Sequence, residues 1–83
     1  MARYYFDTDD GTLALADDVG VELPHDTAAQ MEMLRILREL FEGIKMQSGS
    51  AKCTVDARRE GNDPVGSATA AFEMTWGQSE AES

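Results

Sequence analysis

A single helical segment between two pairs of alternating segments constrains the fold of this chain most. Between Thr27 and about Met46, apolar residues recur every three or four positions, which predicts an amphipathic helix about 30 Å long. Its apolar side holds Met33, Leu34, Ile36, Leu37, Leu40, Phe41 and Ile44. Because one helix can cover only one face of a sheet, the flanking strands must turn their apolar side chains toward that helix.

Both ends of this helix carry residues that typically cap helices. Asp26 or Thr27 is expected to accept a hydrogen bond from a free N–H group of the first turn, and Thr27 with Gln30 has the form of a capping box. Gly49 is expected to end the helix, because glycine readily adopts a positive φ. The outer face is charged and predicts two ion pairs, Arg35 with Glu39 and Arg38 with Glu42.

The residues before the helix predict a β-hairpin. Arg3–Asp7 and Thr12–Ala16 both alternate between large apolar and smaller or polar side chains, and Asp10-Gly11 between them is a strong signal for a tight turn. The inward row should hold Tyr4, Phe6, Leu13 and Leu15, and the outward row Arg3, Tyr5, Asp7, Thr12 and Ala14.

A second hairpin is predicted after the helix. Ala51–Arg58 alternates strictly, Glu60–Gly66 is rich in turn-forming residues, and Ser67–Trp76 alternates again. The inward row should hold Ala51, Cys53, Val55, Ala57, Ala68, Ala70, Phe72, Met74 and Trp76. Residues 77–83 have no large apolar side chain and are predicted to form a disordered acidic tail.

Together these segments predict an α+β fold of the order ββαββ, a four-stranded antiparallel sheet with one amphipathic helix packed on one face. We expect residues 1–76 to form a single domain, since a chain of 83 residues is short for two hydrophobic cores. Strand orders 2-1-3-4 and 1-2-4-3 both keep all neighbours antiparallel, and the sequence does not choose between them.

The aspartate-rich stretch from Phe6 to Asp18 raises the question of a calcium site. An EF-hand loop needs Asp-x-Asp-x-Asp-Gly between helices and a glutamate at its twelfth position. The stretch from Asp7 to Gly11 is one residue short, its flanks are strand-like, and the twelfth position is Asp18. We therefore predict a hairpin turn and no specific metal site. A weaker alternative is that Asp9, Asp10, Asp17 and Asp18 gather at one end of the sheet and collect a divalent ion.

No set of residues in this sequence is typical of an enzyme. His25 is the only histidine and is expected to be a loop residue before the helix, and Cys53 is the only cysteine and is expected to fill space on an inward strand row. Phosphate-binding glycine loops and catalytic triads are not recognisable. We therefore expect no catalytic activity and no cofactor.

Net charge restricts the partners that the chain can have. A formal charge of −9 repels phosphate, which argues against nucleic acids and anionic membranes. No apolar run approaches the roughly 20 residues of a membrane span, and a lone cysteine suits a reducing compartment. We expect a cytoplasmic protein.

By elimination, the sequence favours a small interaction module that binds a protein partner or itself as a homodimer. Arg3, Tyr5 and Met31, together with the sheet edges, are its candidate contact residues. The alternative is a small-ligand-binding or stress-linked regulatory protein with a shallow pocket beside the helix.

The motifs "RYYFD", then "DG", then Asp17-x-x-"GVELP" before an amphipathic helix resemble the opening of a family of short hypothetical proteins. That family is common in rhizobia and related α-proteobacteria and is classified as a domain of unknown function. The resemblance covers residues 3 to about 45 and implies a bacterial cytosolic ββαββ protein. It implies no catalytic residues.

Overall fold

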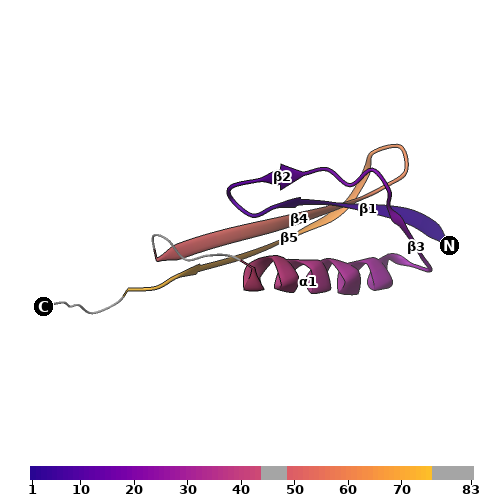
Figure 1. Cartoon of the computed structure of the whole chain (residues 1–83). Helices are drawn as coiled ribbons and strands as arrows, with labels where there is room; N and C mark the ends of the chain where they lie inside the picture. Colours follow the sequence, from indigo (N-terminus) through magenta and orange to yellow (C-terminus); the bar gives the residue numbers. More distant parts are fainter. Residues whose placement is uncertain (44–48, 76–83) are drawn as a thin grey trace, which may run out of the picture.

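An antiparallel sheet with one helix on one face forms the structure, a computed structural model that describes residues 1–43 and 49–75 (Figure 1). Its elements are β1 (Ala2–Asp9), β2 (Ala14–Leu15), β3 (Val21–Leu23), α1 (Asp26–Glu42), β4 (Ser50–Arg59) and β5 (Asp63–Glu73). The strand order is β2-β1-β4-β5, and β3 also pairs with β1. Of the two predicted orders this is 2-1-3-4, and the α+β class is confirmed.

The sheet has five strands rather than the four predicted, because Val21–Leu23, which follows the second predicted strand Thr12–Ala16, forms the additional strand β3. Thr8 and Asp9 of β1 pair with Leu15 and Ala14 of β2, and the chain rejoins the same edge of β1 only at β3. Between them the chain leaves the ladder at Asp17, whose carboxylate accepts a hydrogen bond from the backbone N–H of Phe6. A side chain thus replaces the backbone partner that a continuous strand would have supplied.

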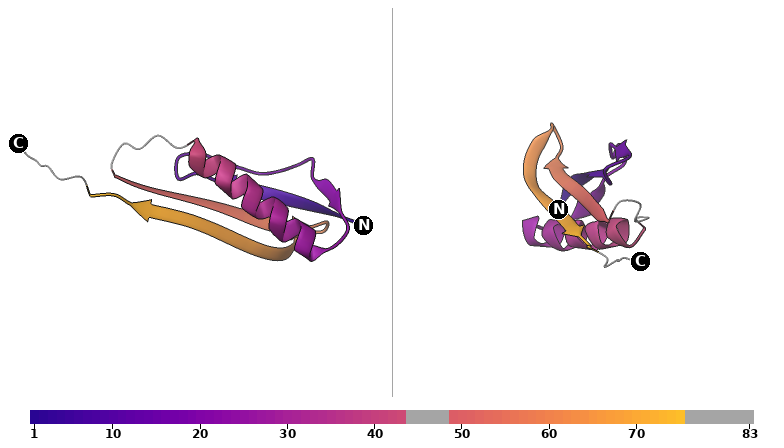
Figure 2. Two further views of the ribbon diagram at one scale, coloured as in Figure 1. Left: turned by 90° about the horizontal axis from the view of Figure 1, so that it is seen from below. Right: turned by 90° about the vertical axis from the view of Figure 1, so that its left-hand side faces the viewer.

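The core lies between α1 and the sheet (Figure 2). Its buried residues come from β1, α1 and β4: Tyr4, Phe6, Ala29, Met33, Leu37, Cys53, Val55 and Ala57. Near the C-terminal end of α1, Phe41 packs edge-on against Phe72 of β5, with ring centroids 4.8 Å apart. The inward rows predicted for β1 and β4 are therefore correct in their large members.

Three residues predicted to face the core do not reach it. Leu13 and Leu15 are 56% and 57% exposed, and Met74 is also exposed. The 17-residue helix packs mainly on β4 and β5, so it does not extend over β2, where Leu15 lies. Trp76, also predicted to face inward, and the predicted acidic tail lie outside the described residues.

The caps of the helix differ from those predicted. His25, rather than Asp26 or Thr27, is the N-cap, and its Nδ1 accepts a hydrogen bond from the N–H of Ala28 at 3.1 Å. The C-cap is Gly43 rather than Gly49, which instead precedes β4 with a φ of +82°. The predicted extension through Met46 lies outside the described residues.

Charged side chains form ion pairs along the exposed face of the helix and hold its first turn against the sheet. Arg35 pairs with Glu39 at 2.8 Å, as predicted, and also with Glu32, whereas the predicted pair of Arg38 with Glu42 does not form. In the first turn, Asp26 accepts a hydrogen bond from the Tyr4 hydroxyl at 2.6 Å and pairs with Arg59 at 3.1 Å, which ties the helix start to β1 and β4.

The second hairpin turns earlier than predicted. Its loop comprises residues 60–62 only, with positive φ at Gly61 and Asn62, so β5 begins at Asp63 rather than Ser67. The register shifts at Val65, which lies between the partners of Ala57 and Arg58 and forms a β-bulge. An extra residue is thereby absorbed in the strand instead of the loop, and β5 becomes 11 residues long.

Candidate functional site

The predicted contact residues do not form one site. Arg3 and Tyr5 lie in β1 on the outward row, away from the helix, and both pack against Gly20. Met31 lies on α1, which covers the opposite face of the sheet, and is 68% exposed. Their roles in binding remain predictions, but a single surface combining all three is not available.

Arg3 and Tyr5 are held by contacts within the chain. Arg3 donates a hydrogen bond to the carbonyl oxygen of Val19 at 2.9 Å and pairs with Glu22 at 3.4 Å. The guanidinium of Arg58 lies over the Tyr5 ring, 4.7 Å from its centroid. A cation–π contact of this kind uses the ring face that a stacking ligand would need.

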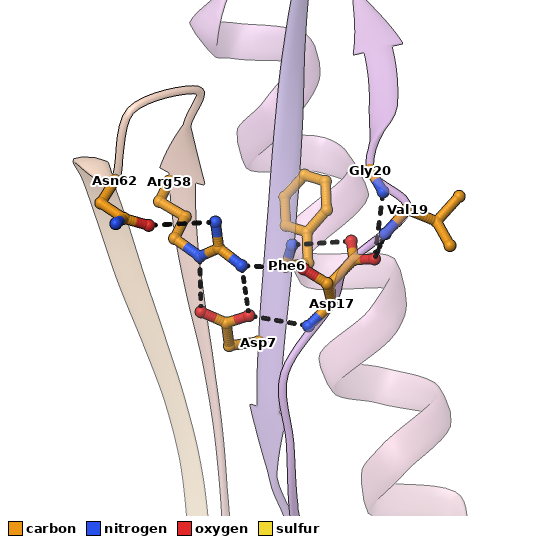
Figure 3. A network of polar contacts seen from close by, with 7 residues as sticks. All are labelled: Phe6, Asp7, Asp17, Val19, Gly20, Arg58 and Asn62. Carbon is orange, nitrogen blue, oxygen red and sulfur yellow. Dashed lines mark hydrogen bonds and ion pairs between the residues drawn. The ribbon is translucent and has the colours of Figure 1, made fainter.

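A polar cluster on the open face joins β1, β4 and the link between β2 and β3 (Figure 3). Arg58 donates to both carboxylate oxygens of Asp7, at 2.9 and 3.3 Å, and to the carbonyl oxygen of Asp17 at 2.8 Å. Asp7 also accepts from the N–H of Asp17 at 2.9 Å. The sequence alone did not indicate this cluster, because Asp17 and Arg58 are 41 residues apart along the chain.

Asp17 organises the link through its own side chain. Its carboxylate accepts hydrogen bonds from the backbone N–H groups of Phe6, Val19 and Gly20, at 3.0 to 3.1 Å. Partial burial raises the pKa of Asp17, but these three donors lower it by more, so that the pKa lies below its ordinary value.

The cluster is built to stay charged. The hydrogen bonds from Arg58 lower the pKa of Asp7, which opposes the effect of its partial burial. The same bonds raise the pKa of Arg58. A carboxylate with a lowered pKa is a poor proton donor near neutral pH, and here its oxygens are already occupied. Its geometry fits a clamp that holds the link on the sheet.

The aspartate-rich turn is a hairpin turn, as predicted. Asp9 accepts from the N–H of Gly11 at 2.8 Å, and Asp10 accepts from the N–H groups of Thr12 and Leu13 at 2.9 and 2.8 Å. Asp17 lies with Phe6 and Arg58 instead, so the weaker alternative, in which four aspartates gather at one end of the sheet, is wrong. Among residues 1–43 and 49–75, no three His, Cys, Asp or Glu side chains lie close enough to hold a metal ion.

Cys53 occupies the inward row of β4, as predicted, and is 0% exposed. Burial raises the pKa of its thiol. The thiolate is the reactive form of cysteine, so both the burial and the raised pKa oppose reaction with an external molecule.

The two edges of the sheet differ in a way that bears on binding. On one edge, β2 and β3 are two and three residues long and are separated by the Asp17 link, and short, interrupted edges resist pairing. On the other edge, β5 is long, and its segment 65–72 contains no charged residue and no proline. Among the described residues, β5 pairs only with β4, so its outer row of N–H and C=O groups is open.

An apolar groove runs beside this edge. The helix crosses the sheet diagonally, so that its C-terminal half diverges from β5 (Figure 2). The resulting groove has a volume of about 540 Å³. It is lined by Leu34, Leu37, Arg38, Phe41 and Glu42 of the helix and by Ala70 of the strand. Leu34 is 56% exposed, so this part of the groove presents apolar surface to solvent.

We take the β5 edge together with this groove as the candidate interaction surface. The sequence predicted both the helix and the last strand. It did not predict that this strand lies at an edge, because it left the strand order open. The uncharged run from Val65 to Phe72 was the feature of the sequence that could have indicated an open edge.

Within the described residues, no helix is long and apolar enough to cross a membrane.

These features define a class of small α+β proteins in which one helix covers one face of an antiparallel sheet and one long edge strand is left open. The chain belongs to a family described as a domain of unknown function, DUF6894, which matches residues 3–71. The resemblance to an uncharacterised family is thus confirmed, and the match includes most of β5 as well as the first hairpin. Searches of curated proteins and of solved structures gave no significant match.

Proposed function

We propose that the protein is a non-enzymatic interaction module, in which the open edge of β5 accepts an additional strand from a protein partner. The observation that carries this proposal is the contrast between the two sheet edges. Strand addition supplies backbone hydrogen bonds to an open edge, and side-chain pockets beside that edge add specificity. The groove at Ala70 has the position that such a pocket requires.

Charge supports a protein partner over nucleic acid or an anionic membrane. The chain carries −9, while segment 65–72 of β5 is uncharged. Contact with phosphates needs clustered cations, and Arg58 is already engaged by Asp7 and Asp17. The fully buried thiol of Cys53 suits the reducing cytoplasm, where we place this contact.

A small apolar ligand in the groove is the second candidate function. A volume of about 540 Å³ lies within the range of ligand pockets, and Leu34, Leu37 and Phe41 would line it. The exposure of Leu34 fits a protein contact better, because ligand sites usually enclose most of their ligand. A thermal-shift screen with apolar metabolites tests this candidate, since a ligand that binds the folded state raises its melting temperature.

Site-specific photo-crosslinking in the native host tests the interaction proposal. A photoreactive residue replaces Ala71 on the β5 edge, and the control carries it at Ala14 on the β2 edge, which is also exposed. We expect covalent adducts with protein from position 71 and few from position 14. Absence of adducts at position 71, or equal adducts at both positions, would contradict the proposal.

A further inference from the structure

We infer that the partner at this edge is a second copy of the chain, joined by antiparallel pairing of β5 with β5 about a two-fold axis at Ala70. This inference rests on the proposed function and names its partner. The two sheets would then form one continuous antiparallel sheet, with both helices on the same face.

The sequence of β5 is complementary to itself in this register. A two-fold axis at Ala70 places Phe72 of each copy opposite Ala68 of the other, so that a large side chain faces a small one on the helix side. It also places Glu73 opposite Ser67 of the second copy, so no like charges face each other. An axis at Ala68 would instead place Glu73 opposite Asp63, and like charges directly opposite destabilise a strand pair.

The position of the groove also favours an axis at Ala70. Ala70 is the β5 residue that lines the groove, so this axis brings the grooves of the two copies together. Within one copy, the N-terminal half of the helix lies over the start of β5 (Figure 2). In the dimer, each groove would therefore face this part of the other copy. Leu34 lines the groove and is exposed, and Met31, which is also exposed, lies three residues before it on the helix surface.

Net charge explains why the pairing is confined to this strip. Two copies of charge −9 repel each other, and the repulsion is weakest where the contact surface carries no charge. Segment 65–72 meets that condition, whereas the β2–β3 edge carries Asp17 and Asp18. A second copy therefore approaches most favourably along β5.

Disulfide formation in the variant Ala70→Cys tests the pairing and its register. Cys53 lies directly opposite Ala70 in the β4–β5 pair and could trap the new thiol within one chain, so both cysteine variants are made in a Cys53→Ala background. Directly opposed residues of an antiparallel pair have Cα atoms about 4.5 to 5.5 Å apart, which permits a disulfide. With oxidised glutathione as the oxidant, we expect most of the Ala70→Cys variant to migrate as a covalent dimer that dithiothreitol reverses. The Cys53→Ala parent contains no thiol and should stay monomeric on the same denaturing gel.

The matched control is Ala71→Cys. Around an axis at Ala70 the two introduced thiols of this variant are offset along the strands by about two residues, which separates their Cα atoms by more than about 7 Å and prevents a disulfide. We therefore expect at least a tenfold lower dimer yield from this variant. Equal yields from both variants, or a higher yield from Ala71→Cys, would overturn the register.

Loss of pairing in Ala70→Lys provides a second readout. Two lysines would face each other at the axis, so we expect this variant to be monomeric by light scattering while its circular dichroism spectrum stays that of wild type. A dimeric Ala70→Lys, or no covalent dimer from Ala70→Cys in the Cys53→Ala background, would overturn the inference. If position 71 still gave photo-adducts heavier than two copies of this chain, the partner would be another protein and the proposed function would survive. If position 71 gave no photo-adducts, the inference and the proposed function would both fail.

Discussion

At the scale of single residues, Asp17 organises the link between β2 and β3 through both its side chain and its backbone. Its carboxylate satisfies three backbone N–H groups, and its own backbone contacts Asp7 and Arg58. These contacts replace strand pairing where the chain leaves the ladder. The β2–β3 link therefore depends on the side chain of Asp17. The neighbouring Asp18 is exposed and serves as a control position.

Replacing Asp17 with alanine should destabilise the fold. The change leaves N–H groups of Phe6, Val19 and Gly20 without their partner, at a cost of about 1–3 kcal/mol in the free energy of unfolding. Urea denaturation of both variants measures this, with Asp18→Ala expected to change stability by less than about 0.5 kcal/mol. Equal effects at the two positions would show that the Asp17 contacts are not formed.

The contribution of Asp17 should also depend on pH in one direction. Its folded-state pKa lies below the unfolded value of about 3.9, so the stabilisation is complete above that value and is lost as pH falls through the folded-state pKa. We expect the stability difference between wild type and Asp17→Asn to be constant from about pH 7 to 5 and to shrink below about pH 4. A difference that grows on acidification would contradict this account.

Comparing Gly20 with Gly61 distinguishes the backbone cost of a side chain at positive φ from the cost of a steric clash. Both have positive φ, of +76° and +80°, but a Cβ at Gly20 would lie 3.0 Å from the carbonyl oxygen of Tyr4, whereas nothing lies within 4 Å at Gly61. Gly61→Ala should therefore cost only the backbone term, about 1–2 kcal/mol, and Gly20→Ala should cost more. Similar losses in chemical denaturation would show that the link does not approach β1 closely.

At the scale of elements, local patterns predicted the helix and β4 well. The three- and four-residue spacing identified Met33 and Leu37, and strict alternation identified Cys53 and Val55, which are all buried. The alternating pattern predicted wrongly that Leu15 is buried. Alternation shows only that the two faces of a strand differ, and it cannot show whether the helix covers that strand. The Asp17 link and the His25 cap also escaped prediction, since both depend on where the chain places backbone N–H groups in space.

The helix provides a prediction with an internal control. Leu37 is buried in the core, so Leu37→Ala should lower the free energy of unfolding by about 2–5 kcal/mol. Leu34→Ala, at an exposed position on the same helix, should cost less than about 1 kcal/mol when unfolding is measured on dilute monomer. A loss under about 0.5 kcal/mol at Leu37 would mean that the helix docks through another face.

At the scale of the whole molecule, strand order determines which surface is open. In the order β2-β1-β4-β5, the interrupted strands β2 and β3 lie at one edge and the long uncharged β5 lies at the other. The alternative order, which the sequence also allowed, would have placed β5 inside the sheet. The candidate surface therefore follows from long-range pairing, in particular that of β1 with β4.

Light scattering on the wild-type protein at several salt concentrations tests the central claim, self-association through the β5 edge, most directly. We expect a mass near twice 9.1 kDa at about 100 µM protein, falling toward 9.1 kDa on dilution. Since two copies of charge −9 repel each other and salt screens that repulsion, the dimer fraction should rise as the salt concentration is raised from about 0.05 to 0.5 M. A mass that stays at 9.1 kDa up to about 1 mM protein in high salt would contradict the account.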